Sequence, residues 1–396
     1  MPFHNADSTI EAAVRSLQNQ TFKNWEAILV DDGSTDASSS IARDFSIGDP
    51  RLKCVRQEKS GVSTARNKGI EICRGKYIHF LDADDVLSPT MFEALVGELE
   101  SKGLDAVCCG WIMADRNLHN LDWRCPPPTE GYLFSRLAHE NLFPLHCAIV
   151  TRDLVESVGG FDPSLNQCED WDLWVRVSRT GIAFAPVAEP LAIYRMQPVS
   201  NSRNAQANFA AGKQVIHRAH AVDLRVQSPK RELYQGCQCS GREAALLEWL
   251  LVCIAVAIAK GDRSEIENLA GKIPDNLAEQ LSPRLTRSMG YALWVATAIP
   301  HGVWEPFCRQ VGEPLMEFLL LLEHRSGLRG FALESLLQII GLRDLQRKPV
   351  LPAGKEVNFA AIDGALLLRA LGRKAANRIT RFVGGGPGKP KSKFRA

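Results

Sequence analysis

The chain has 396 residues, of which 45% are hydrophobic and 23% charged, and this balance excludes a disordered protein and is typical of a soluble globular one. It is long enough for two domains, and the formal net charge of +2 says little about partners. We predict no nucleic-acid partner. Eleven scattered cysteines without a CxxC pair argue against a disulfide framework or a zinc site. They favour free, buried thiols in a reducing cytoplasm.

The beginning of the chain, "MPFHNADSTIEAAV", has neither the basic segment nor the apolar segment of a signal peptide. The most apolar run is "AALLEWLLVCIAVAIA" from Ala244, which is about 16 residues long and contains Glu248. It falls short of a bilayer-spanning helix. We therefore predict that it forms a helix buried in the protein.

The first hundred residues alternate between helical and extended patterns. Helices are predicted at 7–20, 38–45, from Ser63 onward and at 88–101, and strands at 25–30, 52–57 and from Lys76 into "YIHFL". This alternation predicts an α/β domain with a parallel sheet and crossover helices. In such sheets ligands bind at the carboxyl ends of the strands. Because "VDDGSTD" and "FLDADD" both follow apolar strands, we expect them to face one crevice.

The stretch "KYIHFLDADD" ends in three carboxylates, Asp82, Asp84 and Asp85. Carboxylates so close together repel one another and raise each other's pKa, unless a cation lies among them. The cluster therefore predicts a divalent metal site. The alternative is structural: "DADD" can cap the helix that starts near Ser88, and the Asp-Gly of "DDGS" is also typical of a plain turn.

The segment "NQCEDWDLWVRVSRTG" has the spacing of a helix anchored by large apolar residues. Trp171, Leu173, Trp174 and Val177 can hold it in the core while an acid at its start projects into a cleft. Glu169 and Asp170 are the acids at that start. In the alternative interpretation they serve only as partners of the helix dipole.

From about residue 205 the pattern changes to segments of helical length, rich in Ala, Leu, Glu and Arg. We predict a first domain at 1–204, a helical region at 205–383 and a flexible basic tail at 384–396. Nine Lys or Arg residues and no acid follow Asp363. They predict either a solvated helix and tail or peripheral attachment to the anionic inner face of the cell membrane.

Five segments carry a family resemblance: "VDDGSTD", "GVSTARNKGI", "YIHFLDADD", "VGGFDPSL" and "EDWDLWVR". In order and approximate spacing they resemble the family 2 inverting glycosyltransferases with the GT-A fold, over roughly residues 2–202. The resemblance implies transfer from a nucleotide-diphosphate donor, with UDP-sugars favoured, to a saccharide or lipid-linked acceptor. Cell-surface polysaccharide biosynthesis is the implied setting, and Mn²⁺ or Mg²⁺ the implied cofactor.

The resemblance also implies a role for each candidate site residue. The donor would be contacted by Asp31, Asp32, Arg66 and Asp82, and the metal held by Asp84 and Asp82. The general base would be Asp170, with Glu169 the alternative. The acceptor side would include His146 and Asp162.

The sequence departs from the family pattern at two places. The family opens with an apolar strand before its "P-x-x-N" turn, whereas "MPFHN" starts at that turn, so we expect the first strand to be missing and to be encoded upstream. In "YRMQPVSNS", Gln197 stands where a histidine is common, so no diphosphate contact is assigned there. Two rival functions stay open, a phosphotransfer enzyme with an aspartate nucleophile and a nucleotide-sugar-binding or scaffold protein without turnover.

Overall fold

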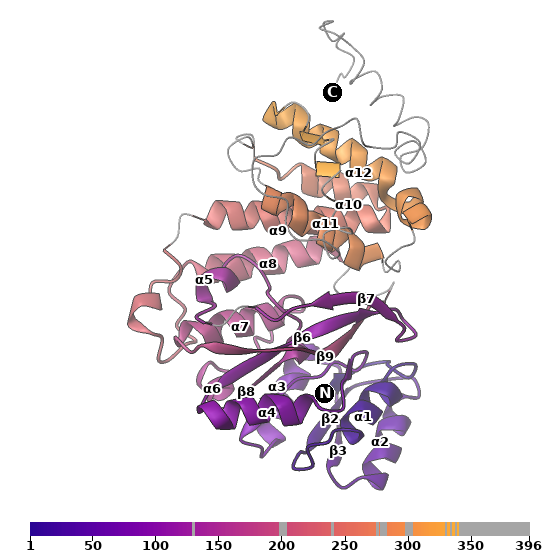
Figure 1. The fold of residues 1–396 in the computed structure, drawn as a ribbon, viewed down its shortest axis with the longest axis vertical. Helices are drawn as coiled ribbons and strands as arrows, with labels where there is room; N and C mark the ends of the chain where they lie inside the picture. Colours follow the sequence, from indigo (N-terminus) through magenta and orange to yellow (C-terminus); the bar gives the residue numbers. More distant parts are fainter. Residues whose placement is uncertain are drawn as a thin grey trace, which may run out of the picture. The chain divides into compact units, whose positions relative to one another are not determined.

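The computed structural model describes residues 1–128, 131–197, 204–238, 241–274, 277, 283–297, 304–328, 331–332, 335–336 and 339. The chain divides into two compact units, Met1–Cys253 and Ile254–Ala396 (Figure 1). The predicted basic tail at 384–396 and the basic segment from Leu366 to Val383 lie outside the described residues.

The N-terminal part contains a parallel sheet in the order β1 (Pro2–Phe3), β2 (Ala27–Asp32) and β3 (Leu52–Gln57). Helices α1 (Ile10–Gln18) and α2 (Ser38–Gly48) connect these strands, and α3 (Val62–Ile72) follows β3. The predicted alternation of strand and helix is confirmed here, with boundaries shifted by a few residues. The carboxyl end of β2 carries Asp31 and Asp32.

Strand β2 is buried on both faces, which explains its nearly continuous apolar sequence. Neighbouring side chains of a strand point to opposite faces. Leu29 accordingly packs in a cluster with Phe3 and Val14, whereas Ile28 and Val30 pack against Ala65 of α3. This double burial fixes the end of β2, and with it the two aspartates.

The expected loss of the first strand is not confirmed. Pro2 and Phe3 form the short strand β1, which pairs in parallel with Val30 and Asp31 of β2. Phe3 is buried in the core. Two residues therefore occupy a strand position beside β2.

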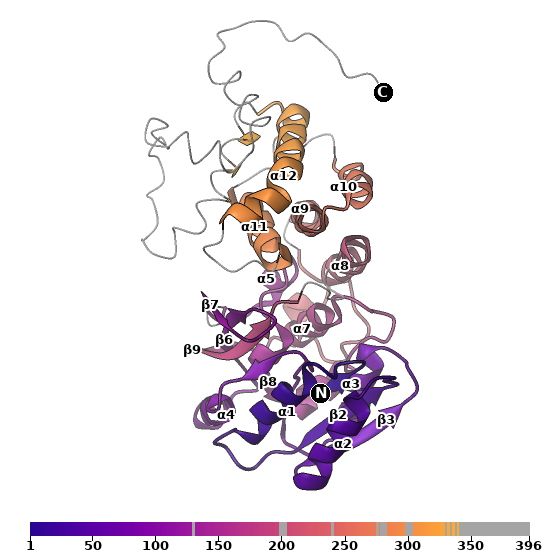
Figure 2. The same ribbon diagram turned by 90° about the vertical axis from the view of Figure 1, so that its right-hand side faces the viewer.

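A second, mixed sheet follows, in the order β4 (Tyr77–His79), β8 (Ala148–Thr151), β6 (Ala106–Ala114), β9 (Phe184–Arg195) and β5 (Val86–Leu87), with β7 (Asn120–Cys125) paired to β6 (Figure 2). Strands β6 and β9 are parallel, and the other recorded pairs of this sheet are antiparallel. The prediction of a purely parallel sheet is therefore wrong for β4, whose partner β8 is antiparallel. That partner lies about seventy residues further along the chain, beyond the reach of local pattern.

The remaining short elements of the first unit are α4 (Met91–Lys102), α5 (Phe134–Leu137), η1 (Leu145–Cys147), α6 (Arg152–Ser157), α7 (Glu169–Arg179), α8 (Ala205–Ala219) and η3 (Arg231–Leu233). Helix α7 is the segment predicted from "EDWDLWVRVSR". Its four expected anchors, Trp171, Leu173, Trp174 and Val177, are fully buried. This packing fixes the start of α7, where Glu169 and Asp170 lie.

The C-terminal region is helical where it is described, as predicted. Its elements are α9 (Arg242–Lys260), in which the division between the two units falls, α10 (Arg263–Ala270), α11 (Pro283–Thr297) and α12 (Trp304–Ser326). The apolar run from Ala244 lies in α9, and Glu248 within it is buried. Among the helices of the described residues, none has the length and apolar content that crossing a bilayer requires.

The prediction of free, buried thiols is confirmed in part: among the described free thiols, Cys54, Cys73 and Cys168 are half-buried and the others are buried. The free thiols among the described residues are Cys54, Cys73, Cys108, Cys109, Cys125, Cys147, Cys168 and Cys253. Cys237 is disulfide-bonded, so the expectation of free thiols is wrong at this position. One such bond does not amount to the disulfide framework that the sequence argued against.

Candidate functional site

Helix α7 starts at a sharp turn. Cys168 precedes it with a left-handed backbone (φ 56°), a conformation that non-glycine residues adopt at a cost and that clusters at functional sites. Glu169 and Asp170 follow at once, at the positive end of the helix dipole. The backbone N–H of Trp171 donates to Oδ1 of Asp170 (2.7 Å). The turn thus brings two carboxylates side by side at the end of a firmly packed helix.

Arg66 of α3 joins this pair to the acidic cluster after β4. Its Nη1 donates to Oε1 of Glu169 (2.6 Å) and its Nη2 to Oδ1 of Asp82 (2.6 Å). Arg66 is 5% exposed, and its guanidinium lies over the ring of Phe161, 5.1 Å from the ring centre. Three segments that are far apart in sequence therefore meet at one cation.

The charges of this bridge stabilise one another. Burial opposes the ionised form of Asp82, but the charge of Arg66 and its hydrogen bond outweigh burial, and the pKa of Asp82 lies below its usual value. Burial likewise opposes the charged form of Arg66, and Asp82 and Glu169 together raise its pKa. Arg66 therefore stays cationic, and Asp82 is ionised at neutral pH.

Asp84 has the opposite environment. Burial, and then the neighbouring charges of Asp85 and Asp82, raise the pKa of Asp84 to about 7. Two side chains hold the residue, one from the last residue of β9 and one from just after it. Nε of Arg195 donates to the carbonyl of Asp84 (2.6 Å), and Nε2 of Gln197 donates to its Oδ2 (3.3 Å). The carboxylate lacks a direct cationic partner among the contacts recorded in the described part of the chain.

These carboxylates fit a divalent cation that is completed by a ligand. The described residues contain no group of three or more His, Cys, Asp or Glu side chains that could hold a metal ion. Asp84 and Asp82 both offer hard oxygen ligands, and a cation would relieve the crowded negative charge at Asp84. Mg²⁺ and similar ions commonly take one or two protein carboxylates and complete their shell with phosphate oxygens and water.

Asp170 has a pKa suited to accepting a proton. Burial and the adjacent charge of Glu169 raise the pKa of Asp170 to about 6, and a hydrogen bond from Asn141 opposes this rise. Nδ2 of Asn141 donates to Oδ2 of Asp170 (3.0 Å) at the exposed edge of the site. A carboxylate that titrates near neutral pH and is oriented by a neighbour has the properties of a general base.

Asp31 and Asp32 shape the loop after β2. Oδ1 of Asp31 accepts from the N–H of Ser34 (2.8 Å), and Arg56 lies 3.4 Å from Oδ2. Asp32 accepts from the N–H groups of Ser60 (2.8 Å) and Gly61 (2.9 Å), just before α3. Both aspartates are buried, and their contacts differ from those of the Arg66 bridge. That these two clusters face one crevice stays a prediction.

His146 lies in the interior rather than at a surface open to an acceptor. It is 1% exposed, and its Nδ1 is 3.0 Å from Oδ2 of Asp85. Burial lowers the pKa of His146, but the charge of Asp85 and its hydrogen bond raise the pKa by more, so that it lies above its usual value. Asp85 also accepts from the N–H of Arg195 (2.8 Å). The pair fixes the loop that carries Asp84.

His146→Phe is expected to destabilise the fold by about 3–5 kcal/mol, since removing one partner of a buried ion pair leaves the other charge unpaired. The measurement is urea denaturation at pH 6, where the raised pKa of His146 keeps the ring charged. Adding Asp85→Asn to this variant removes the unpaired charge and is expected to restore part of the loss. A single variant as stable as the wild type would contradict the assigned ion pair.

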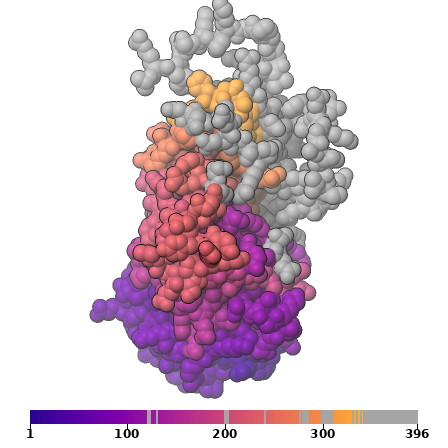
Figure 3. All heavy atoms as spheres, turned by 90° about the vertical axis from the view of Figure 1, so that its left-hand side faces the viewer, coloured from indigo at the N-terminus to yellow at the C-terminus, as the bar shows by residue number. Residues whose placement is uncertain are grey.

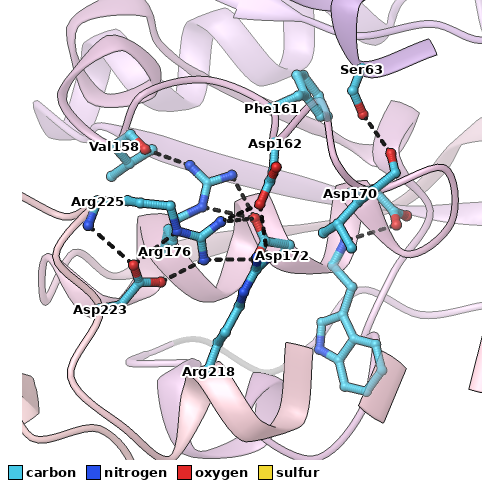
Figure 4. A network of polar contacts seen from close by, with 12 residues as sticks. Ser63, Val158, Phe161, Asp162, Asp170, Asp172, Arg176, Arg218, Asp223 and Arg225 are labelled. Atoms are coloured by element: carbon cyan, nitrogen blue, oxygen red, sulfur yellow. Dashed lines mark hydrogen bonds and ion pairs between the residues drawn. The ribbon is translucent and has the colours of Figure 1, made fainter. Parts of the chain in front are cut away.

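Asp162 belongs to a network of ion pairs beside α7 (Figure 4). Its Oδ2 accepts from Nη1 of Arg218 (2.8 Å) and Nη1 of Arg225 (3.0 Å). Both arginines come from the part of the chain after residue 204. This carboxylate is therefore engaged by protein cations, which is not the arrangement expected of an acceptor contact.

Three side chains that touch the candidate site carry no clear signal in the sequence. Arg195 and Gln197 lie in "YRMQPVSNS", where no contact is expected because Gln197 replaces a more common histidine. The hydrogen bond from Gln197 to Asp84 nonetheless places Gln197 at the acidic cluster. Asn141 stands in "AHENLF", which carries no recognisable motif, so no signal in the sequence could have found it.

A family model described as "Glycosyl transferase family 2" matches residues 1–159. The chain is 34% identical over 212 residues to "Uncharacterized glycosyltransferase EpsJ" of Bacillus subtilis, covering 50% of this chain and 61% of that protein. It is 29% identical over 185 residues to "Chondroitin synthase" of Escherichia coli, covering 46% of this chain and 26% of that protein. The chain thus spans less than two thirds of either relative.

Among solved structures, S. aureus TarS 1-349 in complex with UDP-GlcNAc matches with a TM-score of 0.49 and 17% identity. The match covers 90% of this chain and 93% of that one.

Proposed function

We propose, from the premise that residues 1–159 are a family 2 glycosyltransferase domain, that this chain transfers a sugar from a nucleotide-diphosphate donor to an acceptor hydroxyl. The observation that carries the proposal is the bridge through Arg66, which joins Asp82 of the acidic cluster to Glu169 of the acidic pair. The groups that bind the donor and the group that removes the proton must lie close together. The bridge holds the acidic cluster next to the acidic pair, as this requires.

Asp170 is the general base of the proposed reaction. The acceptor oxygen must lose its proton as it attacks the anomeric carbon from the side opposite the leaving nucleotide. With a pKa of about 6, Asp170 is mostly ionised at pH 7 and can take this proton. One displacement of this kind inverts the anomeric configuration.

Glu169 has a different role because its carboxylate is bound by Arg66 (2.6 Å). It holds the arginine and, through its charge, raises the pKa of Asp170. Of the two neighbouring acids, Glu169 therefore orients Arg66 and Asp170 accepts the proton. Asn141 orients the base from its other side.

Asp84 and Asp82 are the proposed ligands of a divalent cation, Mn²⁺ or Mg²⁺. When bound, the ion would neutralise charge on the departing diphosphate. Asp32 and Asp31 hold the loop after β2 in shape for the nucleotide. UDP-sugars are the favoured donors, and a saccharide or lipid-linked acceptor in cell-surface polysaccharide synthesis is the proposed setting.

The decisive experiment is a screen of UDP- and GDP-sugars for thermal stabilisation with and without Mn²⁺, followed by donor turnover. A ligand at a hundred times its Kd is expected to add about 2.7 kcal/mol of stability. We expect one donor to stabilise only with the metal and then to be consumed. NMR of the product should show the inverted anomer.

Two outcomes would replace this proposal with a rival. Metal-dependent stabilisation without hydrolysis or transfer would indicate a nucleotide-sugar-binding or scaffold protein. A covalently phosphorylated aspartate would indicate a phosphotransfer enzyme. Retention of the anomeric configuration would leave a glycosyltransferase but overturn the single displacement with Asp170 as base.

A further inference from the structure

Helix α7 is tied to its surroundings by a network of six charged side chains, which we call the α7 ion network (Figure 4). Its members are Asp162, Asp172, Arg176, Arg218, Asp223 and Arg225. Three acids and three arginines balance in charge, and two of them, Asp172 and Arg176, are buried, so each needs a partner of opposite charge. Two of the arginines come from residues after 204, beyond the matched family domain.

Asp172 is the buried centre of the network. It lies two residues after Asp170 and accepts from Nε of Arg176 (2.9 Å), a neighbour one turn further along α7. Arg225 contacts both of its oxygens, with Nη2 at 2.9 Å and Nη1 at 3.1 Å. Such bidentate contacts between a guanidinium and a carboxylate fix the orientation of both groups and also stabilise their charges.

Arg225 and Arg218 also reach the loop that leads into α7. Both donate to Oδ2 of Asp162, which is seven residues before Glu169. Asp223 holds Arg225 in turn, through Nε (2.9 Å) and Nη2 (2.6 Å). Arg225 therefore links the loop and the helix and is itself oriented by a third carboxylate.

The opposite side of this loop is bonded to α3. Asn67 exchanges two hydrogen bonds with the backbone of Phe161 (2.8 Å each), and Ser63 donates to the carbonyl of Leu165 (3.0 Å). Gly160 has a positive φ of 64°, and a Cβ there would lie 2.6 Å from Oδ1 of Asn67. The loop is thus held between α3 on one side and the two arginines on the other.

The segment that carries the arginines is itself fixed to α7. Helix α8 packs against α7 in both ribbon views (Figures 1 and 2). Arg179, at the end of α7, is fully buried and donates to the carbonyls of Arg218 (2.9 Å), Ala219 (3.1 Å) and Ala221 (2.7 Å). In the space-filling view the residues after α8, in pink to red, cover purple residues of the N-terminal half (Figure 3).

We propose that Arg218 and Arg225 are positioning residues, which hold the loop at 159–168 and the first turn of α7 so that Asp170 and Glu169 keep their places beside Arg66. The proposal rests on the proposed function of that pair. It places the end of the catalytic unit beyond the matched residues 1–159 and beyond the predicted domain boundary at 204.

The test compares Arg225→Gln with Arg225→Lys. UDP with Mn²⁺ is titrated to obtain the Kd and the number of binding-competent sites, and turnover of the best donor is then expressed per competent site. Because small misplacements of reacting groups cost up to about 10²-fold, we expect Arg225→Gln to lower this turnover roughly 10–100-fold with the Kd unchanged. Arg225→Lys should restore part of it. Arg15→Gln, which removes an exposed ion pair with Glu11, is the control.

A second measurement needs no substrate. Backbone hydrogen exchange at 160–172 should be faster in Arg225→Gln and unchanged in Arg15→Gln. Asp162→Asn should also raise the rate of hydrogen exchange at 160–172. Arg225→Gln should raise this rate less in the Asp162→Asn background than in the wild type, because substitutions of contacting residues are not additive.

Two results would overturn the proposal. In the first, Arg225→Gln leaves the turnover per binding-competent site unchanged and lowers at most the number of molecules that bind UDP. That result would show that Arg225 serves only the stability of the fold. In the other, exchange at 160–172 is unchanged in Arg225→Gln and Asp162→Asn. A wild-type protein that turns over no donor would instead refute the proposed function, while the exchange data would still decide whether the arginines hold the loop.

Discussion

Asp170→Asn is expected to lower transfer by about 10²–10⁴-fold and to leave donor affinity nearly unchanged. The amide has the shape of the carboxylate and can still accept the hydrogen bond from Asn141, but it cannot take a proton. The change does not touch the contact between Arg66 and Asp82, which we propose bind the sugar donor. The measurement is steady-state turnover together with calorimetric binding of UDP and Mn²⁺.

The pH dependence gives this variant a signature. Because Asp170 must be ionised to act as a base, wild-type turnover is expected to rise as the pH increases through about 6. The same raised pKa means that ionising Asp170 costs the folded state stability as the pH rises through that value. Asp170→Asn avoids this cost, so its stability relative to the wild type should be more favourable at pH 8 than at pH 5.

Glu169→Gln is the matched control. Its carboxylate is engaged by Arg66, so the change should weaken the bridge and lower the pKa of Asp170 by removing a neighbouring charge. The rise in turnover with pH should then move to lower pH, and turnover should fall less than in Asp170→Asn. If Glu169→Gln proves the more severely impaired variant, the assignment of the base to Asp170 is wrong.

The elements of the first sheet could be predicted because their signals are local. The pattern "LKCVRQ" predicted a strand with the observed bounds of β3, and the burial of Trp171 and Trp174 followed from helical spacing. The pairing of β4 with β8 could not be predicted in this way. It depends on which distant segment packs against β4, and no periodicity records that choice.

The candidate site shows the same division. Runs of acids identified Asp82, Asp84 and the pair at the start of α7, because closely spaced carboxylates have few uses without a cation or a proton to transfer. Their partners are set by tertiary contacts. The two ion pairs of Arg66 and the contact of Gln197 with Asp84 each join residues separated by sixteen or more positions.

The residues assigned to the acceptor side show why resemblance alone is a weak guide to a side chain's role. His146 and Asp162 occupy the expected places in the chain, yet each is paired with a charged side chain of the protein, Asp85 and Arg218 respectively. Arg218 and Arg225, which pair with Asp162, come from a region without any motif. A residue whose partner lies outside the recognised segments cannot be interpreted until that partner is known.

Asp84→Ala is expected to weaken the binding of UDP in the presence of Mn²⁺ by at least roughly 10–100-fold, the loss that follows when even outer-shell partners of metal sites are removed. Calorimetry with and without Mn²⁺ measures it. The fold should remain intact, because Asp84 is repelled by Asp82 and Asp85, and its pKa is raised to about 7. A raised pKa means that ionisation costs stability as the pH increases through that value, so the variant should gain most in melting temperature above pH 7.

Asp82→Asn is the contrasting variant for this site. Asp82 is stabilised in its ionised form by Arg66, so removing its charge should lower the melting temperature at neutral pH, where Asp84→Ala raises it. The opposite signs of the two changes in melting temperature distinguish Asp84, whose charge is not balanced by a protein cation among the residues that the structure describes, from Asp82, whose charge is balanced by Arg66. Unchanged affinity for UDP and Mn²⁺ in Asp84→Ala would remove Asp84 from the metal site, and a fall in its melting temperature would show that its charge is stabilised by a contact other than the metal.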